Sequence, residues 1–239
     1  MTTSLLTYNL FFSSAITHIS KITKLYSPDI LCFQEMITNE KNFKILEDLG
    51  YKLADFSNSF IKFGKVYGLA TFYNEKALTF LGSKSLTLPR SYSEILLSIM
   101  RGAHNPRTVL KADFEDRHTG KKFTVYNLHL TPWATNGIRV KQIQETLSDL
   151  NINKLEHVLI AGDFNYPYGR RKFEELIAQY GLAEATSNLY YTLQSKLFKF
   201  IPIKLKLDYV LYKGVGFKET QRLSINFSDH FPILSSFQI

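Results

Sequence analysis

The sequence predicts an α/β domain that contains more than one β-sheet. The chain has 239 residues, 45% of them hydrophobic, and is therefore long enough to enclose one large core. Short apolar stretches typical of buried strands alternate with stretches whose apolar residues recur at helical spacing. This alternation indicates sheets that are covered by helices. We expect a single domain over residues 1–239.

The N-terminal part of the chain predicts two strand–helix pairs. Residues 5–12 form the first expected strand, and Ser13 and Ser14 offer an N-cap for the amphipathic helix that follows. Residues 29–34 form a second, buried strand, after which Asn39 is expected to cap a second helix.

The rest of the chain continues this pattern, with a predominantly β region before the next helices. The expected elements are short β segments over residues 51–115, a strand over 121–130, a helix over about 137–150, a buried strand at 158–161, a helix around 173–180, and final strands at 207–212 and 232–239.

Charge and cysteine content limit the classes of partner and compartment. The 29 Lys and Arg residues against 21 Asp and Glu give a net charge of +8, which mildly favours polyanionic partners. Cys32 is the one cysteine and lies in an apolar stretch, which favours a cytoplasmic, intracellular protein. No apolar run is long enough to cross a membrane, and residues 5–15 lack the basic start of a signal peptide. We expect a monomer.

A carboxylate and an amide follow the buried strand at residues 158–161. Gly162 allows the backbone to turn, and Asp163 and Asn165 come next with one residue between them. Such a carboxylate can deprotonate a water molecule, and the amide can donate to a phosphoryl oxygen. A strand that ends in an Asx-type turn explains these residues equally well.

Polar residues whose side chains could act in catalysis or metal binding also lie at or near the ends of other expected strands. They are Asn9, Glu35, His129, Asp208, Asp229 and His230. Each one alone has a structural explanation, such as a solvated strand end, a hydrogen-bonded histidine or ordinary turn chemistry. The set is more informative than any member, because it occurs as six blocks in a fixed order: TYNL, DILCFQE, YNLHLTP, AGDFN, LDYVLY and SDHFPI.

These six blocks together resemble the endonuclease/exonuclease/phosphatase superfamily, which includes DNase I. The resemblance covers residues 4–238, almost the whole chain. It implies a four-layer α/β/β/α sandwich, in the α/β (α+β) class, of two packed mixed or antiparallel sheets with outer helices. It also implies a hydrolase whose site lies at one edge of the sandwich.

The resemblance assigns roles residue by residue. It implies metal binding by Asn9, Glu35 and Asp229, and catalysis by His129, Asp163, Asn165, Asp208 and His230. Arg107 corresponds to a phosphate-contacting arginine of DNase I-like enzymes. The carboxylate and amide oxygens suit Mg²⁺, with Mn²⁺ as a possible substitute, and no Cys/His cluster suggests zinc.

The substrate class is set outside the shared site. Residues 195–206 carry four lysines between apolar residues, and we expect Lys204 and Lys206, together with Trp133, to contact the substrate. Hydrolysis of nucleic acid, with DNA favoured, is the first hypothesis. A phospholipid or sphingomyelin phosphodiesterase that docks on an anionic lipid surface is the alternative. A strand with one solvated face also explains residues 195–206.

Overall fold

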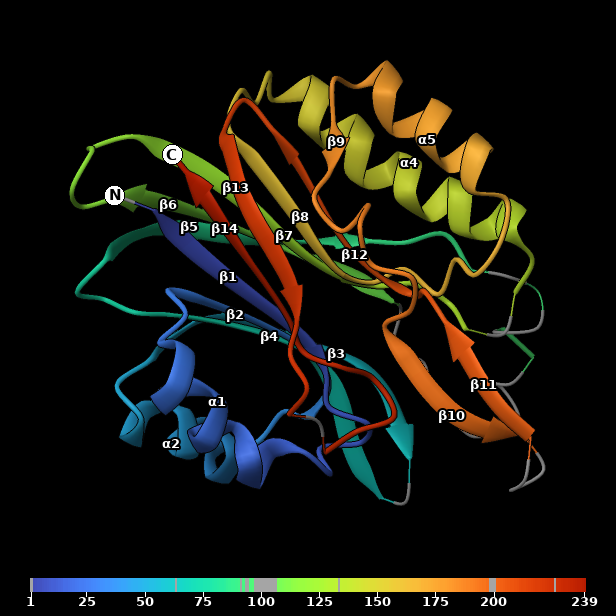
Figure 1. Ribbon diagram of the computed structural model, residues 1–239, viewed down its shortest axis with the longest axis horizontal. Helices are drawn as coiled ribbons and strands as arrows, with labels where there is room; N and C mark the ends of the chain where they lie inside the picture. The colour runs from blue at the N-terminus through green and yellow to red at the C-terminus, as the bar shows by residue number, and fades with distance from the viewer. Residues whose placement is uncertain are drawn as a thin grey trace.

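Two six-stranded sheets pack face to face, and helices cover the outer face of each (Figure 1). The computed structural model describes residues 2–62, 64–90, 92, 95–96, 107–132, 134–197, 201–225 and 227–239. This arrangement of layers confirms the sandwich that the sequence predicts. Within the described ranges, no helix combines the length and apolar character that spanning a membrane requires.

The first sheet gathers strands from both ends of the chain. Its order is β13 (Gly216–Arg222), β14 (Ile233–Gln238), β1 (Thr3–Asn9), β2 (Ile30–Ile37), β4 (Lys65–Tyr73) and β3 (Lys52–Lys62). The short helical turn η1 (Ile16–His18), α1 (Ile19–Tyr26) and α2 (Glu40–Asp48) lie on its outer side (Figure 1).

The second sheet comes from the middle of the chain. Its order is β5 (Leu78–Thr87), β6 (Thr108–Asp116), β7 (Lys122–His129), β8 (Val158–Asp163), β12 (Asp208–Lys213) and β9 (Ala183–Glu184). Helices α4 (Asn136–Ile152) and α5 (Arg170–Gln179) cover it. The strands β10 (Leu193–Leu197) and β11 (Ile201–Leu205) form a separate hairpin that belongs to neither sheet.

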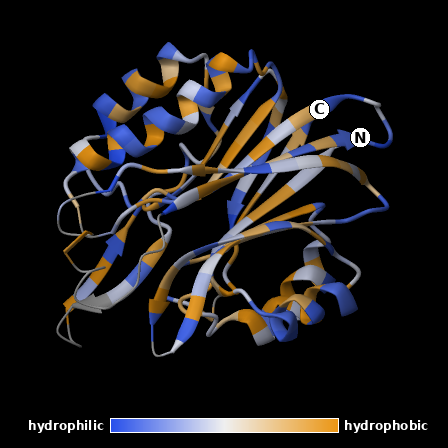
Figure 2. Cartoon of the chain, turned by 180° about the vertical axis from the view of Figure 1, so that it is seen from behind, coloured by the Kyte–Doolittle hydropathy of each residue, from blue (hydrophilic) through white to orange (hydrophobic). Residues whose placement is uncertain are grey.

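Three buried apolar clusters correspond to the three interfaces between four layers. One lies between the two sheets and includes Leu5, Val125 and Val210. The other two join each sheet to its helices, as the apolar inward faces of the helices in Figure 2 illustrate. Burial of apolar surface therefore stabilises the packing of every layer on the next.

Strand direction brings the ends of several strands to one edge of the sandwich. Strands β1 and β2 are parallel, as are β7 and β8, so each pair ends at the same edge of its sheet. Strand β14 runs antiparallel to β1, and β12 runs antiparallel to β8, so both begin at that edge. Polar residues at these ends are thereby collected in one place.

The region after β1 differs from the sequence prediction. Strand β1 ends at Asn9 rather than at residue 12, because Phe11, Phe12 and Ser13 adopt left-handed backbone conformations in succession, which ends the extended path of the strand. Neither Ser13 nor Ser14 caps the next helix; Ser13 Oγ instead accepts a hydrogen bond from Ile37 N at 2.6 Å. The Asn39 cap is confirmed, since its side chain accepts a bond from Asn42 N.

Candidate active site

The inward faces of four strands change from apolar to polar as they approach the shared edge. On β1 the sequence Leu5, Thr7, Asn9 points between the sheets, and on β7 the sequence Val125, Asn127, His129 does the same. Because side chains alternate along a strand, the polar edge follows from the period-two pattern of each segment. The site is thus a polar end of the inter-sheet core.

The register of the second sheet places three candidate catalytic residues side by side. His129 on β7 pairs with Asp163 on β8, and Asp163 pairs with Asp208 on β12. Gly162 precedes Asp163 with φ +144°, and a Cβ atom there would lie 2.0 Å from the carbonyl oxygen of Leu128. Glycine therefore permits the close approach of β8 to β7 that sets this register.

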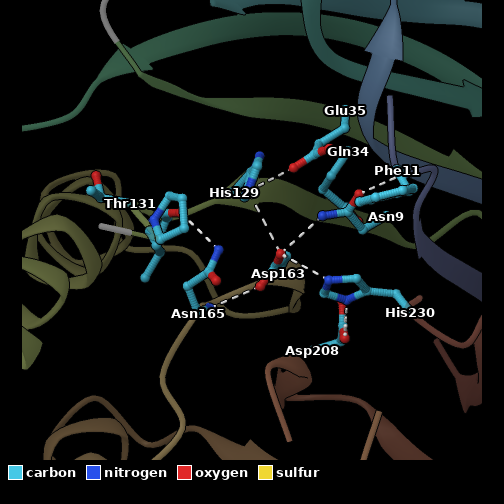
Figure 3. Close-up of polar contacts among 12 residues, drawn as sticks. Asn9, Phe11, Gln34, Glu35, His129, Thr131, Asp163, Asn165, Asp208 and His230 are labelled. Atoms are coloured by element: carbon cyan, nitrogen blue, oxygen red, sulfur yellow. Dashed lines mark hydrogen bonds and ion pairs between the residues drawn. The ribbon is translucent and has the colours of Figure 1, made fainter. Parts of the chain in front are cut away.

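Asp163 lies at the centre of the cluster (Figure 3). Its Oδ2 accepts a hydrogen bond from Asn9 Nδ2 at 3.0 Å and lies 3.6 Å from His129 Nε2 and 3.7 Å from His230 Nε2. Its Oδ1 accepts a bond from the backbone N–H of Asn165 at 2.9 Å. Each oxygen keeps a further lone pair, so the carboxylate is held in place and can still accept a proton.

A chain of hydrogen bonds fixes His230. Its Nδ1 lies 2.8 Å from Asp208 Oδ2, and the same oxygen accepts a bond from Thr192 Oγ1 at 2.7 Å. Thr192 Oγ1 in turn accepts bonds from the backbone N–H groups of Leu207 and Asp208. This arrangement places the proton of Nδ1 toward Asp208 and directs Nε2 toward Asp163.

Asn9 and Glu35 reach the site from the first sheet. A bulge interrupts the pairing of β2 with β4 between Phe33 and Met36, and Glu35 takes a left-handed conformation with φ +53°. This bulge aims the Glu35 carboxylate across the sheet interface, where Oε1 lies 3.8 Å from His129 Nε2. A left-handed backbone at a buried glutamate costs free energy, and such outliers concentrate at functional sites.

Asn165 and Arg107 complete the rim around Asp163. Asn165 is also left-handed, with φ +48°, and its Nδ2 donates to the carbonyl of Leu130 at 3.1 Å, which leaves one amide proton for another acceptor. Arg107 Nη1 donates to the carbonyl of His129 at 3.3 Å. The guanidinium of Arg107 therefore lies beside His129, and its phosphate contact stays a prediction.

Burial and neighbouring charges shift the pKa values of the two histidines in opposite directions. Burial lowers the pKa of His129 well below its ordinary range, and the positive charges of Arg107 and His230 lower it further. Burial alone would also lower the pKa of His230, but the Asp208 and Asp163 carboxylates outweigh it and raise that pKa to about 10. At neutral pH the site thus holds one neutral imidazole and one imidazolium.

Two carboxyl groups of the site, those of Asp163 and Glu35, have raised pKa values. Burial raises the pKa of Asp163, and the nearby charge of Asp208 adds to this effect while His230 opposes it. Burial also raises the pKa of Glu35. A base is most effective when its pKa lies near the working pH, so the raised pKa suits Asp163 to accept a proton from water.

The raised pKa of His230 predicts a pH-dependent stability. His230 contributes fully below the unfolded-state pKa of about 6.5, and the contribution is lost as the pH rises from there toward 10. Between about pH 6.5 and 9.5, the metal-free protein should lose roughly 1 kcal/mol per pH unit relative to His230→Gln. Urea unfolding of both proteins in EDTA measures this difference. A difference that stays constant with pH contradicts the assigned charge state.

A buried polar contact joins the two sheets directly beneath the site. Gln34 Nε2 donates to Asn127 Oδ1 at 2.8 Å, and Asn127 Nδ2 lies within hydrogen-bonding distance of acceptors on Phe33, Ala70 and Thr71. Both amide side chains are fully buried. Because directional bonds tolerate less sliding than apolar packing, this contact fixes the position of one sheet against the other.

The remaining predicted site residues lie in different surroundings. Asp229 Oδ1 accepts a weak bond from Ser228 Oγ at 3.4 Å, and Ser228 Oγ also donates to the Asn9 carbonyl. Lys204 is exposed on β11, with its ammonium 4.7 Å from the centre of the Tyr191 ring. Lys206 forms an ion pair of 2.6 Å with Glu184, so a substrate phosphate would have to compete with that carboxylate. Trp133 lies outside the described residues.

Several residues of the site are not evident from the sequence. Thr192, Gln34 and Asn127 hold site residues or the sheets in place, but none belongs to a motif whose spacing assigns it that role. The signal available for Thr192 is a buried hydroxyl between aromatic and apolar neighbours, which is too common to be specific. The partners described above are 15 to 94 residues away in the chain, and only the fold brings them together.

Three side chains are close enough to share a metal ion. Ligand atoms of Asp163, Asp208 and His230 all lie within 4.8 Å of one another, so this buried group could hold a cation. This set differs from the predicted ligands Asn9, Glu35 and Asp229. His230 is committed to its bond with Asp208, whereas Glu35 Oε1 points between the sheets and lies 3.8 Å from His129 Nε2. Hard oxygen donors at Asn9 and Glu35 fit Mg²⁺ or Mn²⁺.

Comparison with known proteins identifies the family. The family model described as Endonuclease/Exonuclease/phosphatase family matches residues 6–230. The chain belongs to this family. Members of the endonuclease/exonuclease/phosphatase family hydrolyse phosphoesters, and this protein is a phosphoester hydrolase of that superfamily. The matched range includes every residue of the cluster in Figure 3.

Individual relatives within the family are distant. A UPF0294 protein of Vibrio vulnificus is 25% identical over 248 residues, which cover 99% of this chain and 77% of that protein. The mannosyl-6-phosphatase of Bacteroides thetaiotaomicron superposes with a TM-score of 0.77 and 17% identity, over 99% of this chain and 100% of that one. TDP2 of D. rerio, complexed with a single-strand DNA product, superposes with a TM-score of 0.73 and 16% identity, over 100% of this chain and 99% of that one. These two structural likenesses show the fold.

Proposed function

We propose that the protein is a divalent-metal-dependent phosphodiesterase that cleaves the backbone of nucleic acid, with DNA as the favoured substrate. The observation that carries this proposal is the environment of Asp163. A buried carboxylate with a raised pKa stands within 3.7 Å of a neutral and a protonated imidazole and is held by two amide groups. A base and a cation fixed this close together suit in-line attack on a phosphodiester.

Each residue of this cluster has a distinct part in the proposed reaction. Water attacks the phosphorus atom and gives its proton to Asp163, while the bond to the leaving oxygen breaks and that oxygen takes up a proton from solvent. The imidazolium of His230 and the free amide proton of Asn165 stabilise the negative charge that grows on the phosphoryl oxygens. Asp208 keeps His230 protonated and oriented, as the 2.8 Å contact supports. Neutral His129, on the opposite side of Asp163 from His230, donates a hydrogen bond to the substrate phosphate.

The metal would bind between Asn9 and Glu35 at the first sheet. Glu35 supplies a carboxylate that is only partly exposed, and the Asn9 amide beside it supplies a neutral oxygen. Mg²⁺ bound there supplies Lewis acidity toward the phosphoryl oxygen. The Asp163, Asp208 and His230 group is a second candidate, and Mn²⁺ is a possible substitute for Mg²⁺.

Charge supports a polyanionic substrate. The net charge is +8, and Arg107 at the site and Lys204 on the β10–β11 hairpin add local positive charge. The family likeness includes a protein bound to single-strand DNA and a sugar phosphatase, so the superfamily scaffold serves several substrate classes. The monomeric state and cytoplasmic location remain predictions from the sequence.

The test is cleavage of supercoiled plasmid DNA in Mg²⁺, with EDTA as the control. We expect nicked and then linear plasmid in Mg²⁺ and no change in EDTA. Intact plasmid after prolonged incubation with folded, Mg²⁺-bound protein would reject the proposal. Cleavage that persists in EDTA would reject its metal dependence.

The alternative function is phosphodiester hydrolysis at a lipid surface. One observation favours it: strand β11 carries both an exposed apolar residue, Ile201 at 53% exposure, and an exposed lysine, Lys204, a combination that suits an anionic membrane. Release of phosphocholine from sphingomyelin vesicles, by a protein that leaves plasmid DNA intact, would support this alternative.

Metal binding should also stabilise the fold, which can be measured without an activity assay. Mg²⁺ at about ten times its Kd should stabilise the protein by about 1.4 kcal/mol, which raises the melting temperature by about 3–5 °C. Glu35→Gln should abolish this shift because the amide is a much weaker ligand than the carboxylate. Thermal unfolding with and without Mg²⁺ measures it, and Glu175→Gln, an exposed glutamate on α5, serves as the matched control. An equal shift in Glu35→Gln contradicts the assignment of Glu35.

A further inference from the structure

The loop that follows β1 has an unusual backbone. Phe11, Phe12 and Ser13 have φ values of +44°, +57° and +61°, three consecutive left-handed residues that are not glycine. For a bulky L-residue this region is sterically unfavourable, and single glycine or asparagine residues normally occupy it. The fold therefore accepts a cost in free energy at this loop.

The backbone of this loop serves the candidate metal ligands. The N–H of Phe11 donates to Asn9 Oδ1 at 3.0 Å, and the N–H of Phe12 donates to Glu35 Oε2 at 3.2 Å. The N–H of Ser13 donates to the Glu35 carbonyl at 3.0 Å. The left-handed path turns three successive N–H groups toward Asn9 and Glu35, which explains the conformation but not the choice of side chains.

Packing accounts for the side chain of Phe12. Its ring meets Phe60 and Tyr67 edge-on, with centroids 6.0 and 5.5 Å away, and the ammonium of Lys62 lies 3.5 Å from its centre. Aromatic and cation–π contacts of this kind offset part of the backbone cost. Phe12 thereby anchors the loop to the β3–β4 hairpin.

Packing does not account for Phe11. Its side chain is 44% exposed, and its aromatic neighbour within the described part of the chain is Phe12, at 5.2 Å. Asparagine or glycine at this position would satisfy the backbone at lower cost and expose no apolar surface. Phe11 thus keeps exposed apolar surface on a strained backbone that bonds Asn9, and a group outside the chain can cover that surface.

We propose that Phe11 is a stacking surface for the nucleobase next to the scissile phosphate. This inference rests on the proposed nucleic-acid substrate and names the part of it that the enzyme recognises. Every nucleobase has a flat face that an aromatic ring can cover, so the contact favours substrates with bases without selecting a sequence. Phe12, Phe60 and Lys62 hold the loop, and the N–H of Phe11 bonds Asn9 Oδ1, which keeps Phe11 beside the predicted metal ligands.

The experiment compares two single-stranded oligonucleotides in Mg²⁺. One is a thymidine oligomer, and the other has the same backbone with tetrahydrofuran residues in place of the nucleosides. We expect the wild-type protein to cleave the base-bearing oligomer with a kcat/KM about 5- to 100-fold higher. Phe11→Ala should bring this ratio close to one, and Phe11→Trp should retain it. The ratio isolates the base contact from effects on the chemical step.

A matched control separates the stacking contact from a general loss of aromatic surface. Phe56 on β3 is 40% exposed and lies 5.1 Å from the ring of Phe43, and Phe56→Ala should keep the wild-type ratio. Asparagine fits the left-handed backbone. Phe11→Asn should therefore lose the preference for the base-bearing oligomer without lowering the melting temperature. This second variant keeps the test valid if Phe11→Ala folds poorly.

The outcomes distinguish this inference from the proposed function. Equal cleavage of both oligomers by the wild-type protein overturns the stacking contact and leaves the nuclease function standing. Cleavage of neither oligomer rejects the nuclease function itself, and the stacking contact with it. A ratio unchanged in Phe11→Ala and Phe11→Asn assigns base recognition to other residues and overturns the inference.

Discussion

Asp163→Asn should lower kcat/KM for DNA by about 10³-fold or more. The substitution keeps the shape of the side chain but replaces the proton-accepting carboxylate with an amide. It also removes the negative charge that faces the imidazolium of His230 at 3.7 Å. Because Asp163 is buried and its pKa is raised, its ionised form is costly to the fold, so the variant should be no less stable than the wild type.

Two measurements check this expectation: the initial rate of plasmid nicking and the melting temperature of the variant. Asp113→Asn is the matched control, because Asp113 accepts a hydrogen bond from Thr124 near the opposite end of β7. The control should keep its rate. Asp163→Asn that retains a tenth of the wild-type rate would contradict the assignment of Asp163 as the base. A variant that loses activity by unfolding would instead show a lowered melting temperature.

Gly162→Ala should lower the free energy of unfolding by about 3 kcal/mol. The added methyl group would lie 2.0 Å from the Leu128 carbonyl oxygen, and φ +144° is a conformation that alanine rarely adopts. Relief requires β8 to move away from β7, which would break the register that sets Asp163 beside His129. Activity should therefore fall together with stability.

Urea unfolding measures this loss, and Gly137→Ala is its control. Gly137 lies in the first turn of α4, and a Cβ atom there would come no closer than 3.7 Å to the Thr135 hydroxyl. Alanine has the higher helix propensity, so this change should be neutral or stabilising by up to about 1 kcal/mol. Equal stabilities for the two variants would mean that the close approach of β7 and β8 is not required.

Periodicity alone predicted an α/β domain with more than one sheet, and the family resemblance of the six sequence blocks predicted the four layers that the structure shows. Alternating polar residues near strand ends identify Asn9, His129 and Asp163, because direction and period place such residues at one edge. The hydroxyl of Thr192 and the amide of Asn127 could not be assigned in this way, since their roles depend on partners from other strands. Local pattern determines which face a residue occupies, and tertiary contacts determine what it meets.

One local prediction failed for a clear physical reason. Residues 10–12 continue the apolar pattern of β1, but the loop turns away to supply N–H groups to Asn9 and Glu35. Polar groups elsewhere in the chain outweigh the local pattern there. The expected substrate contact of Lys206 stays a prediction, and the structure adds its ion pair with Glu184 from a distant segment.

The chain order of the two sheets has a consequence during synthesis. Residues 3–73 supply four strands of the first sheet, residues 78–213 form the whole second sheet, and only then are β13 and β14 made. Until β14 is made, β1 has an open edge and His230 is absent. The polar cluster around Asp163 is therefore complete only when β14 closes the first sheet beside β1.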